Sequence, residues 1–162
     1  MPTQRGASGL LSRLPAQPEV FIALYAFLLN FVWEMWQVPF FRDIGGGPHW
    51  SGVISCTQAT FGDAAIALFA YGCVALSSRA RFWLLAPARR EIAAYLAIGL
   101  AVTIVFEALA TGPLERWRYS EAMPTLPWLG TGVLPLAQWL ALPPLVLWLA
   151  RGQIRGARSG DR

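Results

Sequence analysis

Four long runs of apolar residues dominate the sequence, covering residues 20–41, 53–76, 92–111 and 133–150. Each run contains roughly 18–24 residues, which at a helical rise of about 1.5 Å per residue is enough to cross the ~30 Å hydrocarbon layer of a bilayer. Hydrophobic residues make up 56% of the chain and charged residues only 14%, against about 25% charged in ordinary soluble domains. The pattern predicts an all-α, polytopic membrane protein, a bundle of four transmembrane helices.

The arginines predict an orientation. The chain contains no lysine, and its arginines are concentrated before the first run, in the second connection and after the fourth run. The first and third connections carry acids that balance their arginines. By the positive-inside rule, both termini lie in the cytoplasm (N-in/C-in) of a multi-pass protein in a bacterial-type inner (cytoplasmic) membrane. We expect these arginines to contact membrane lipids, and no nucleic acid.

Three segments follow from this pattern. Residues 1–18 are polar and rich in proline and glycine, and they form a cytoplasmic N-terminal arm and not a cleaved signal, because no small-residue cleavage site follows the first run. Residues 19–151 form the four-helix membrane domain, and residues 152–162 form a basic cytoplasmic tail. Pro143 and Pro144 remove two backbone donors from the fourth helix, so a kink or a break is expected there.

Every apolar run carries one stripe of polar residues. In the first run Asn30, Glu34 and Gln37 follow i, i+4, i+7 spacing and share one helix face. A carboxylate that faces lipid costs a few kcal/mol, so we expect the stripes of the four helices to face one another. The other stripes comprise Cys56, Thr60 and Asp63 in the second run, Thr103, Glu107 and Thr111 in the third, and Thr131 and Gln138 in the fourth.

The ionisable groups gather in the half of the bundle that is predicted to be outer. Counted along each helix, they lie roughly 6–15 Å below the outer boundary, beneath the glycine-rich segment 42–52 and the aromatic-rich segment 112–132. Two interpretations stay open. The acids either join the helices by hydrogen bonds, or they line a cavity open to the outer side. Segment 112–132 is long enough to fold back over the mouth, and Arg116 or Arg118 is a candidate partner for Glu34 or Glu107.

The sequence predicts no metal site and identifies no cofactor. His49 is the only histidine and lacks the spacing of a metal-binding motif, and a haem held by two histidines is excluded unless a partner supplies one. Cys56 and Cys73 lie roughly 25 Å apart along one helix and cannot form a disulfide with each other.

Residues 106–139 (FEALATGPLERWRYSEAMPTLPWLGTGVLPLAQW) resemble a segment of membrane-integral carotenoid hydratases and small lycopene-cyclase-type proteins. The shared features are an intramembrane glutamate, an aromatic-rich turn with the pattern R-x-Tyr-Ser, and a proline-containing segment that leads into the next helix and ends in tryptophan. The resemblance implies protonation of a double bond in a long polyene by carboxyl groups inside the membrane. It assigns roles to Glu107, Tyr119 and Trp139. The chain differs from the hydratases in having only four predicted helices.

These observations predict an enzyme that acts on a hydrophobic or lipid-like small molecule by acid–base chemistry, through isomerisation, cyclisation or hydration. Two alternatives stay open. One is a non-enzymatic accessory subunit of a larger membrane complex associated with pigment, quinone or haem, and the other is a small proton-coupled transporter that uses Asp63. The chain is also a candidate for a homo-oligomer. The expected catalytic residues are Glu34, Glu107 and Asp63, and the expected substrate-binding residues are Asn30, Gln37, Thr60, Thr103, Gln138, Trp33, Trp139, Arg116, Arg118 and Tyr119.

Overall fold

The computed structural model describes residues 17–42 and 48–160. Within this part of the chain four helices are long and apolar enough to cross a membrane, and there is no β-strand beyond two isolated bridges. The predicted all-α fold with four spanning-length helices is therefore confirmed. The expected N-terminal arm falls almost wholly outside the described residues. The elements are α1 (Pro18–Gln37), η2 (Val38–Phe40), α3 (His49–Ser78), η3 (Trp83–Leu85), α4 (Arg89–Thr111) and α5 (Val133–Gly160).

The helix ends follow local sequence signals. Pro18 lies in the first turn of α1, where its missing N–H is no loss, and Glu19 beside it suits the positive end of the helix dipole. The carboxylate of Glu91 accepts a hydrogen bond from the backbone N–H of Ala88 at 2.7 Å and so caps α4. Arg79 ends α3 in the left-handed conformation, with φ 54°.

Two helices extend beyond the apolar runs that predicted them. α3 begins at His49, so this histidine occupies the first turn of a helix and is not part of the glycine-rich loop. α5 continues to Gly160, so most of the expected basic tail is helical. Arginine and glutamine are good helix formers, which explains why the helix continues after its apolar run ends at Ala150.

Of the predicted kink or break at Pro143 and Pro144, the break does not occur, because α5 is continuous through both residues. The fixed φ of proline is compatible with a helix, so two prolines cost hydrogen bonds without forcing the chain to stop. The carbonyls of Trp139 and Leu140 lose their usual i+4 donors. Buried packing at Val146 and Leu147 holds the helix just beyond this point.

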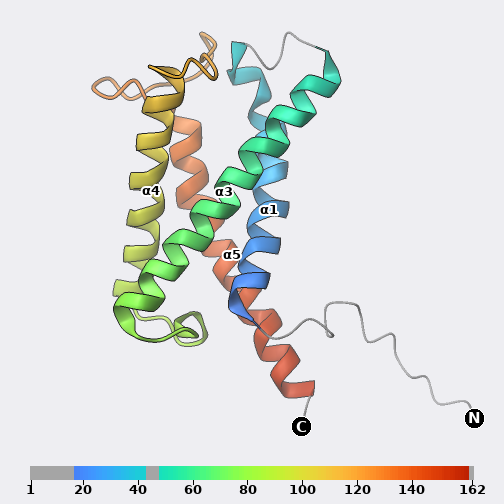
Figure 1. Ribbon diagram of the computed structural model, residues 1–162, viewed down its shortest axis with the longest axis vertical. Helices are drawn as coiled ribbons and strands as arrows, with labels where there is room; N and C mark the ends of the chain where they lie inside the picture. Colours follow the sequence, from blue (N-terminus) through green and yellow to red (C-terminus); the bar gives the residue numbers. More distant parts are fainter. Residues whose placement is uncertain (1–16, 43–47, 161–162) are drawn as a thin grey trace, which may run out of the picture.

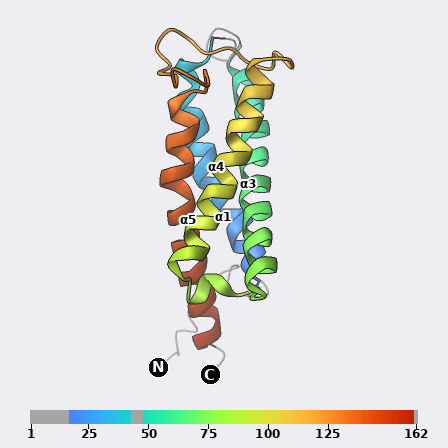
Figure 2. The ribbon, with the colours of Figure 1, turned by 90° about the vertical axis from the view of Figure 1, so that its left-hand side faces the viewer.

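The four long helices form a ring in which α1 and α4 occupy opposite corners. α1 contacts α3 and α5, and α4 contacts the same two helices, as the two perpendicular views show (Figures 1 and 2). Residues 38–42, the start of α3 and residues 112–132 lie at one end, which we call the loop end. Pro18, residues 79–88 and Gly160 lie at the opposite end, which we call the termini end (Figure 1).

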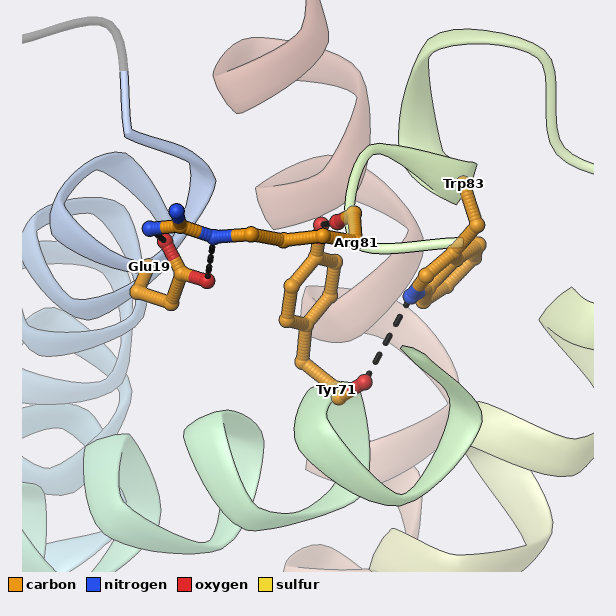
Figure 3. Close-up of polar contacts among 4 residues, drawn as sticks. All are labelled: Glu19, Tyr71, Arg81 and Trp83. Atoms are coloured by element: carbon orange, nitrogen blue, oxygen red, sulfur yellow. Dashed lines mark hydrogen bonds and ion pairs between the residues drawn. The ribbon is translucent and has the colours of Figure 1, made fainter. Parts of the chain in front are cut away.

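An ion pair, a hydrogen bond from a tyrosine hydroxyl and a stack of two aromatic rings hold the connection between α3 and α4 at the termini end (Figure 3). Arg81 donates from Nε and Nη2 to the two carboxylate oxygens of Glu19 in α1, at 2.8 and 3.0 Å. Tyr71 of α3 donates its hydroxyl hydrogen to the backbone carbonyl of Arg81, and its ring stacks on Trp83. The short loop is thereby held against both α1 and α3.

Small residues allow close helix contact in the middle of the bundle. Ala64, Ala67 and Ala70 of α3 are buried at three-residue spacing, a pattern that brings helix backbones together. On the other side, Gly99 of α4 faces the ring of Trp139 in α5. A Cβ atom at position 99 would lie only 2.1 Å from that ring. The contact sets how closely α4 approaches α5.

Candidate functional site

Gln138 of α5 is the centre of a polar cluster between the helices. Its amide nitrogen Nε2 lies 2.7 Å from Asn30 Oδ1 and 3.0 Å from Asp63 Oδ2. A third acceptor, Glu34 Oε1, lies 3.3 Å from the same nitrogen. An amide nitrogen carries two hydrogens, so three acceptors share two donors. The cluster joins α1, α3 and α5, and Asn30, Glu34 and Gln138 are buried while Asp63 is half-buried.

Two residues of α1 orient the carboxyl group of Glu34. Gln37 donates from Nε2 to Glu34 Oε1 at 2.8 Å, and Trp33 donates from Nε1 to Gln37 Oε1 at 3.1 Å. The indole N–H therefore engages the carbonyl end of the Gln37 amide, which leaves its NH₂ end for Glu34. The i+3 and i+4 spacing places all three side chains on neighbouring positions of one helix surface.

Glu107 of α4 brings a third carboxyl group to this region. Like Glu34, Glu107 is buried, and it lies near the end of α4 that meets segment 112–132. Oxygen Oε2 of Glu107 accepts hydrogen bonds from the Tyr119 hydroxyl and, at 3.4 Å, from Trp117 Nε1. The acids gather in the half of the bundle next to the loop end.

Arg116 and Arg118 were candidate partners for Glu34 or Glu107. Both arginine side chains are exposed, and Glu107 is instead satisfied by Tyr119 and Trp117. Uncharged donors satisfy a buried carboxyl group without bringing a guanidinium group out of water, which would add its own desolvation cost.

Segment 112–132 folds back over the loop end of the bundle. Tyr119 forms an isolated antiparallel bridge with Phe41, and the backbone N–H of Ser120 donates to the carbonyl of Phe40 at 2.9 Å. The Tyr119 hydroxyl also accepts a hydrogen bond from the backbone N–H of Gly132 at 3.0 Å. The segment is thus attached to η2, to α4 and to the start of α5, and it covers the acids from the loop end.

The Tyr119 hydroxyl is suited to donate in this position. Burial, and then the neighbouring charge of Glu107, raise the pKa of Tyr119 above its ordinary value. The hydroxyl therefore keeps its proton throughout the neutral range, and it donates to Glu107 while accepting from Gly132.

The other expected site residues occupy separate positions. Thr60 donates to the Cys56 carbonyl of its own helix at 2.8 Å, which uses its hydroxyl hydrogen. Trp139 lies against Gly99 at the interface of α4 and α5. Trp139 Nε1 and the hydroxyl of Thr103 are both buried without a hydrogen-bond partner in the described part of the chain. These last two are candidates for contacting a bound polar group, and Thr60 is a helix-packing residue.

Trp117 and Phe41 belong to the site but were not among its expected residues. A usable signal exists, because residues 117 and 119 are two apart in an extended segment and point to the same side. Phe41 packs on the rings of Trp117 and Tyr119, with centroids 6.4 and 5.7 Å away. No comparable pattern in the sequence indicates that contact.

Among the described residues, no group of three or more His, Cys, Asp or Glu side chains is arranged to hold a metal ion. His49 is exposed at the start of α3. The carboxyl groups of Glu34 and Asp63 receive their hydrogen bonds from amide groups.

We predict that Gln138→Leu lowers the free energy of unfolding by about 2 kcal/mol, because the buried acceptors of Asn30 and Glu34 and the half-buried acceptor of Asp63 lose their shared donor. Unfolding in mild detergent, followed by loss of helical circular dichroism, measures the change. Gln58→Leu is the matched control, since Gln58 lies exposed on α3. Equal effects of the two substitutions would contradict the assignment of Gln138 as the centre of the cluster.

We predict that Tyr119→Phe releases segment 112–132. The substitution removes both hydrogen bonds of the hydroxyl group. Loss of a hydrogen bond to a charged group raises the equilibrium constant for detachment of the segment from the bundle roughly ten-fold. Trypsin should then cleave after Arg116 or Arg118 about ten times faster in lipid nanodiscs. Trp128→Phe, in the same segment but 95% exposed, should leave the rate unchanged. An unchanged rate for Tyr119→Phe would show that other contacts hold the segment.

Comparisons with known proteins give no relative. No protein-family model matches the chain, no curated protein matches it significantly, and no solved structure does so either.

Proposed function

We propose that the protein is an integral membrane enzyme that acts on a hydrophobic or lipid-like small molecule by acid–base chemistry. The observation that carries the proposal is the joint hydrogen bonding of Asp63 and Glu34 to one nitrogen of Gln138. Three acids in the half of the bundle next to the loop end are a costly way to join helices, because interhelical hydrogen bonds in membranes average only about 0.6 kcal/mol. Ionisable groups within a membrane more often belong to a site.

The chemistry follows from the proximity of the two carboxyl groups. Carboxylates this close repel each other when both are ionised, so the pair holds one shared proton most readily. One carboxyl group gives this proton to a carbon–carbon double bond, which leaves a carbocation. Loss of a proton from a neighbouring carbon to the carboxylate completes an isomerisation or cyclisation, and addition of water followed by proton return completes a hydration.

The remaining residues have supporting roles in this proposal. Gln37 and Trp33 orient Glu34, and Tyr119 holds Glu107 while covering the site. Trp139 and Thr103 supply buried, unpartnered donors for a polar group on the substrate. A polyene of carotenoid type fits the resemblance of residues 106–139.

In this proposal the chain has an N-in/C-in orientation in a bacterial-type inner membrane, and the site opens toward the outer leaflet. The excess of arginine at the termini end supports the orientation. A reporter protein that works only in the cytoplasm should therefore be active when it is fused after Arg162. A reporter that works only outside the cytoplasm should be inactive at the same position.

The test of the proposal is to identify the molecule that the protein binds. The full chain is purified from its own membranes in mild detergent, and its lipid-soluble contents are analysed by mass spectrometry. We expect an unsaturated hydrophobic molecule that is enriched at least several-fold over the surrounding membrane and depleted in an Asp63→Asn preparation. A content identical to the bulk membrane in both preparations would contradict the proposal.

The second candidate function is an accessory subunit of a larger membrane complex. Its supporting observation is a set of tryptophans whose rings are more than half exposed, and large aromatic residues are enriched where subunits meet. The same purification tests it, because a subunit would co-migrate with other proteins or with a coloured group. The exposed tryptophans are Trp36, Trp50, Trp128 and Trp148.

A proton-coupled transporter receives less support. Transport needs a polar route on both sides of Asp63, and the core between the helices toward the termini end is lined by apolar side chains. Those fully buried there include Phe21, Ile22, Val74, Val146 and Ile154.

A further inference from the structure

A hollow of about 390 Å³ lies between α1 and α5 near the termini end, far along α5 from Gln138. Tyr25 of α1 forms one side. The other side consists of α5 residues, among them Trp148, Arg151, Gly152 and Arg155. The hollow therefore has an aromatic part toward the middle of the bundle and a cationic part where the apolar run ends.

The two arginines of the hollow are positioned to bind an anion. Arg155 donates from Nη2 to the backbone carbonyl of Leu85 at 2.8 Å, which fixes its guanidinium group beside the hollow. Arg151 has a buried Nε–H with no hydrogen-bond partner among the described residues. A buried donor without an acceptor is unfavourable, so an acceptor from outside the protein would relieve this cost.

Charge and depth together indicate the kind of anion. Among the described residues, no acid lines the hollow, and Glu19, the acid at the start of α1, is already bound to Arg81. Arg151 directly follows Ala150, the last residue of the apolar run, so the guanidinium groups lie at the expected level of lipid headgroups. Guanidinium groups bind phosphate through two parallel hydrogen bonds.

We propose that this hollow binds an anionic phospholipid of the leaflet at the termini end. The phosphate group accepts hydrogen bonds from Arg151 and Arg155, and an acyl chain lies against Tyr25 and Trp148. Trp148 is 68% exposed, as expected for a ring that contacts lipid near the interface. The site is separate from the carboxyl cluster, so it does not depend on the proposed enzymatic function.

The experiment measures binding of phosphatidylglycerol to the full chain in detergent by native mass spectrometry, with phosphatidylcholine and inorganic phosphate as comparison ligands. We expect phosphatidylglycerol to bind roughly ten times more tightly than phosphatidylcholine. Arg151→Gln should weaken this binding by about ten-fold. Arg158→Gln is the matched control, because Arg158 lies at the same end but over the ring of Phe82, 4.5 Å from its centroid.

A second pair of variants tests the hollow without changing charge. A Cβ atom added at Gly152 or at Gly156 meets nothing within 4 Å, so α5 should fold normally in both variants, but only Gly152 lines the hollow. Gly152→Leu should therefore reduce phosphatidylglycerol binding about ten-fold, and Gly156→Leu should leave it unchanged. The proposal is overturned if Arg151→Gln and Arg158→Gln have equal effects, or if Gly152→Leu binds normally. Equally tight binding of inorganic phosphate would assign the site to free phosphate in place of lipid.

Discussion

Glu34→Gln is expected to reduce turnover at least roughly 100-fold, the range for removal of a general acid or base. The substitution keeps the shape of the side chain but removes its ability to take up and release a proton. The amide oxygen of a glutamine at position 34 still accepts the hydrogen bonds that Gln37 and Gln138 now donate to Glu34. The variant should therefore accumulate in the membrane at the level of the original protein. Product in lipid extracts, divided by the amount of folded protein, gives the rate.

Glu121→Gln is the matched control for this experiment. Glu121 lies at the loop end and binds Arg42 at 3.1 Å, but its side chain is 93% exposed. Its substitution should leave turnover unchanged. If Glu34→Gln retained full activity while Asp63→Asn also remained active, the carboxyl pair would be a structural feature and the enzymatic proposal would fail.

Much of the site was predictable because the polar residues are rare and regularly spaced. Asn30, Glu34 and Gln37 share one helix face by their spacing alone. The cost of exposing a carboxylate to lipid then requires these residues to meet Asp63, Glu107 and Gln138 inside the bundle. Both facts are independent of the order in which the helices pack, so a single sequence is enough to recognise them.

The partners of Glu107 were harder to predict. Helix periodicity fixes relative positions within a helix, but segment 112–132 has irregular structure, and its path depends on contacts with Phe40 and Phe41 at the end of the first helix. Arginine was the expected partner because opposite charges attract. The structure has Tyr119 and Trp117 instead, since a buried position favours donors with a low desolvation cost. The continuity of α5 through Pro143 and Pro144 was also hard to predict, because it depends on tertiary packing.

Gly99→Ala is expected to destabilise the protein by about 3 kcal/mol, the upper end for overpacking a close contact. The added Cβ would lie 2.1 and 2.2 Å from two atoms of the Trp139 ring. That ring is only 3% exposed, so it has little room to move aside, and α4 must shift away from α5. Gly72→Ala is the matched control. Gly72 is also helical, and a Cβ there meets nothing within 4 Å, so alanine should stabilise α3 by about 0.5–1 kcal/mol.

The opposite signs expected at Gly99 and Gly72 separate the steric effect from helix propensity, because both substitutions improve propensity equally. Trp139→Leu in the Gly99→Ala background should restore part of the lost stability, because the smaller side chain leaves room for the Cβ atom of Ala. Unfolding in detergent measures the stability of the original protein, the two single variants and the double variant, which together form a double-mutant cycle. Thr103 and Glu107 lie one and two turns beyond Gly99 on the same face of α4. A shift of α4 would therefore also move Glu107 away from Glu34 and Asp63, so Gly99→Ala should lower turnover together with stability. A variant that is fully stable would show that Trp139 moves freely, and Gly99 would then not fix the distance between α4 and α5.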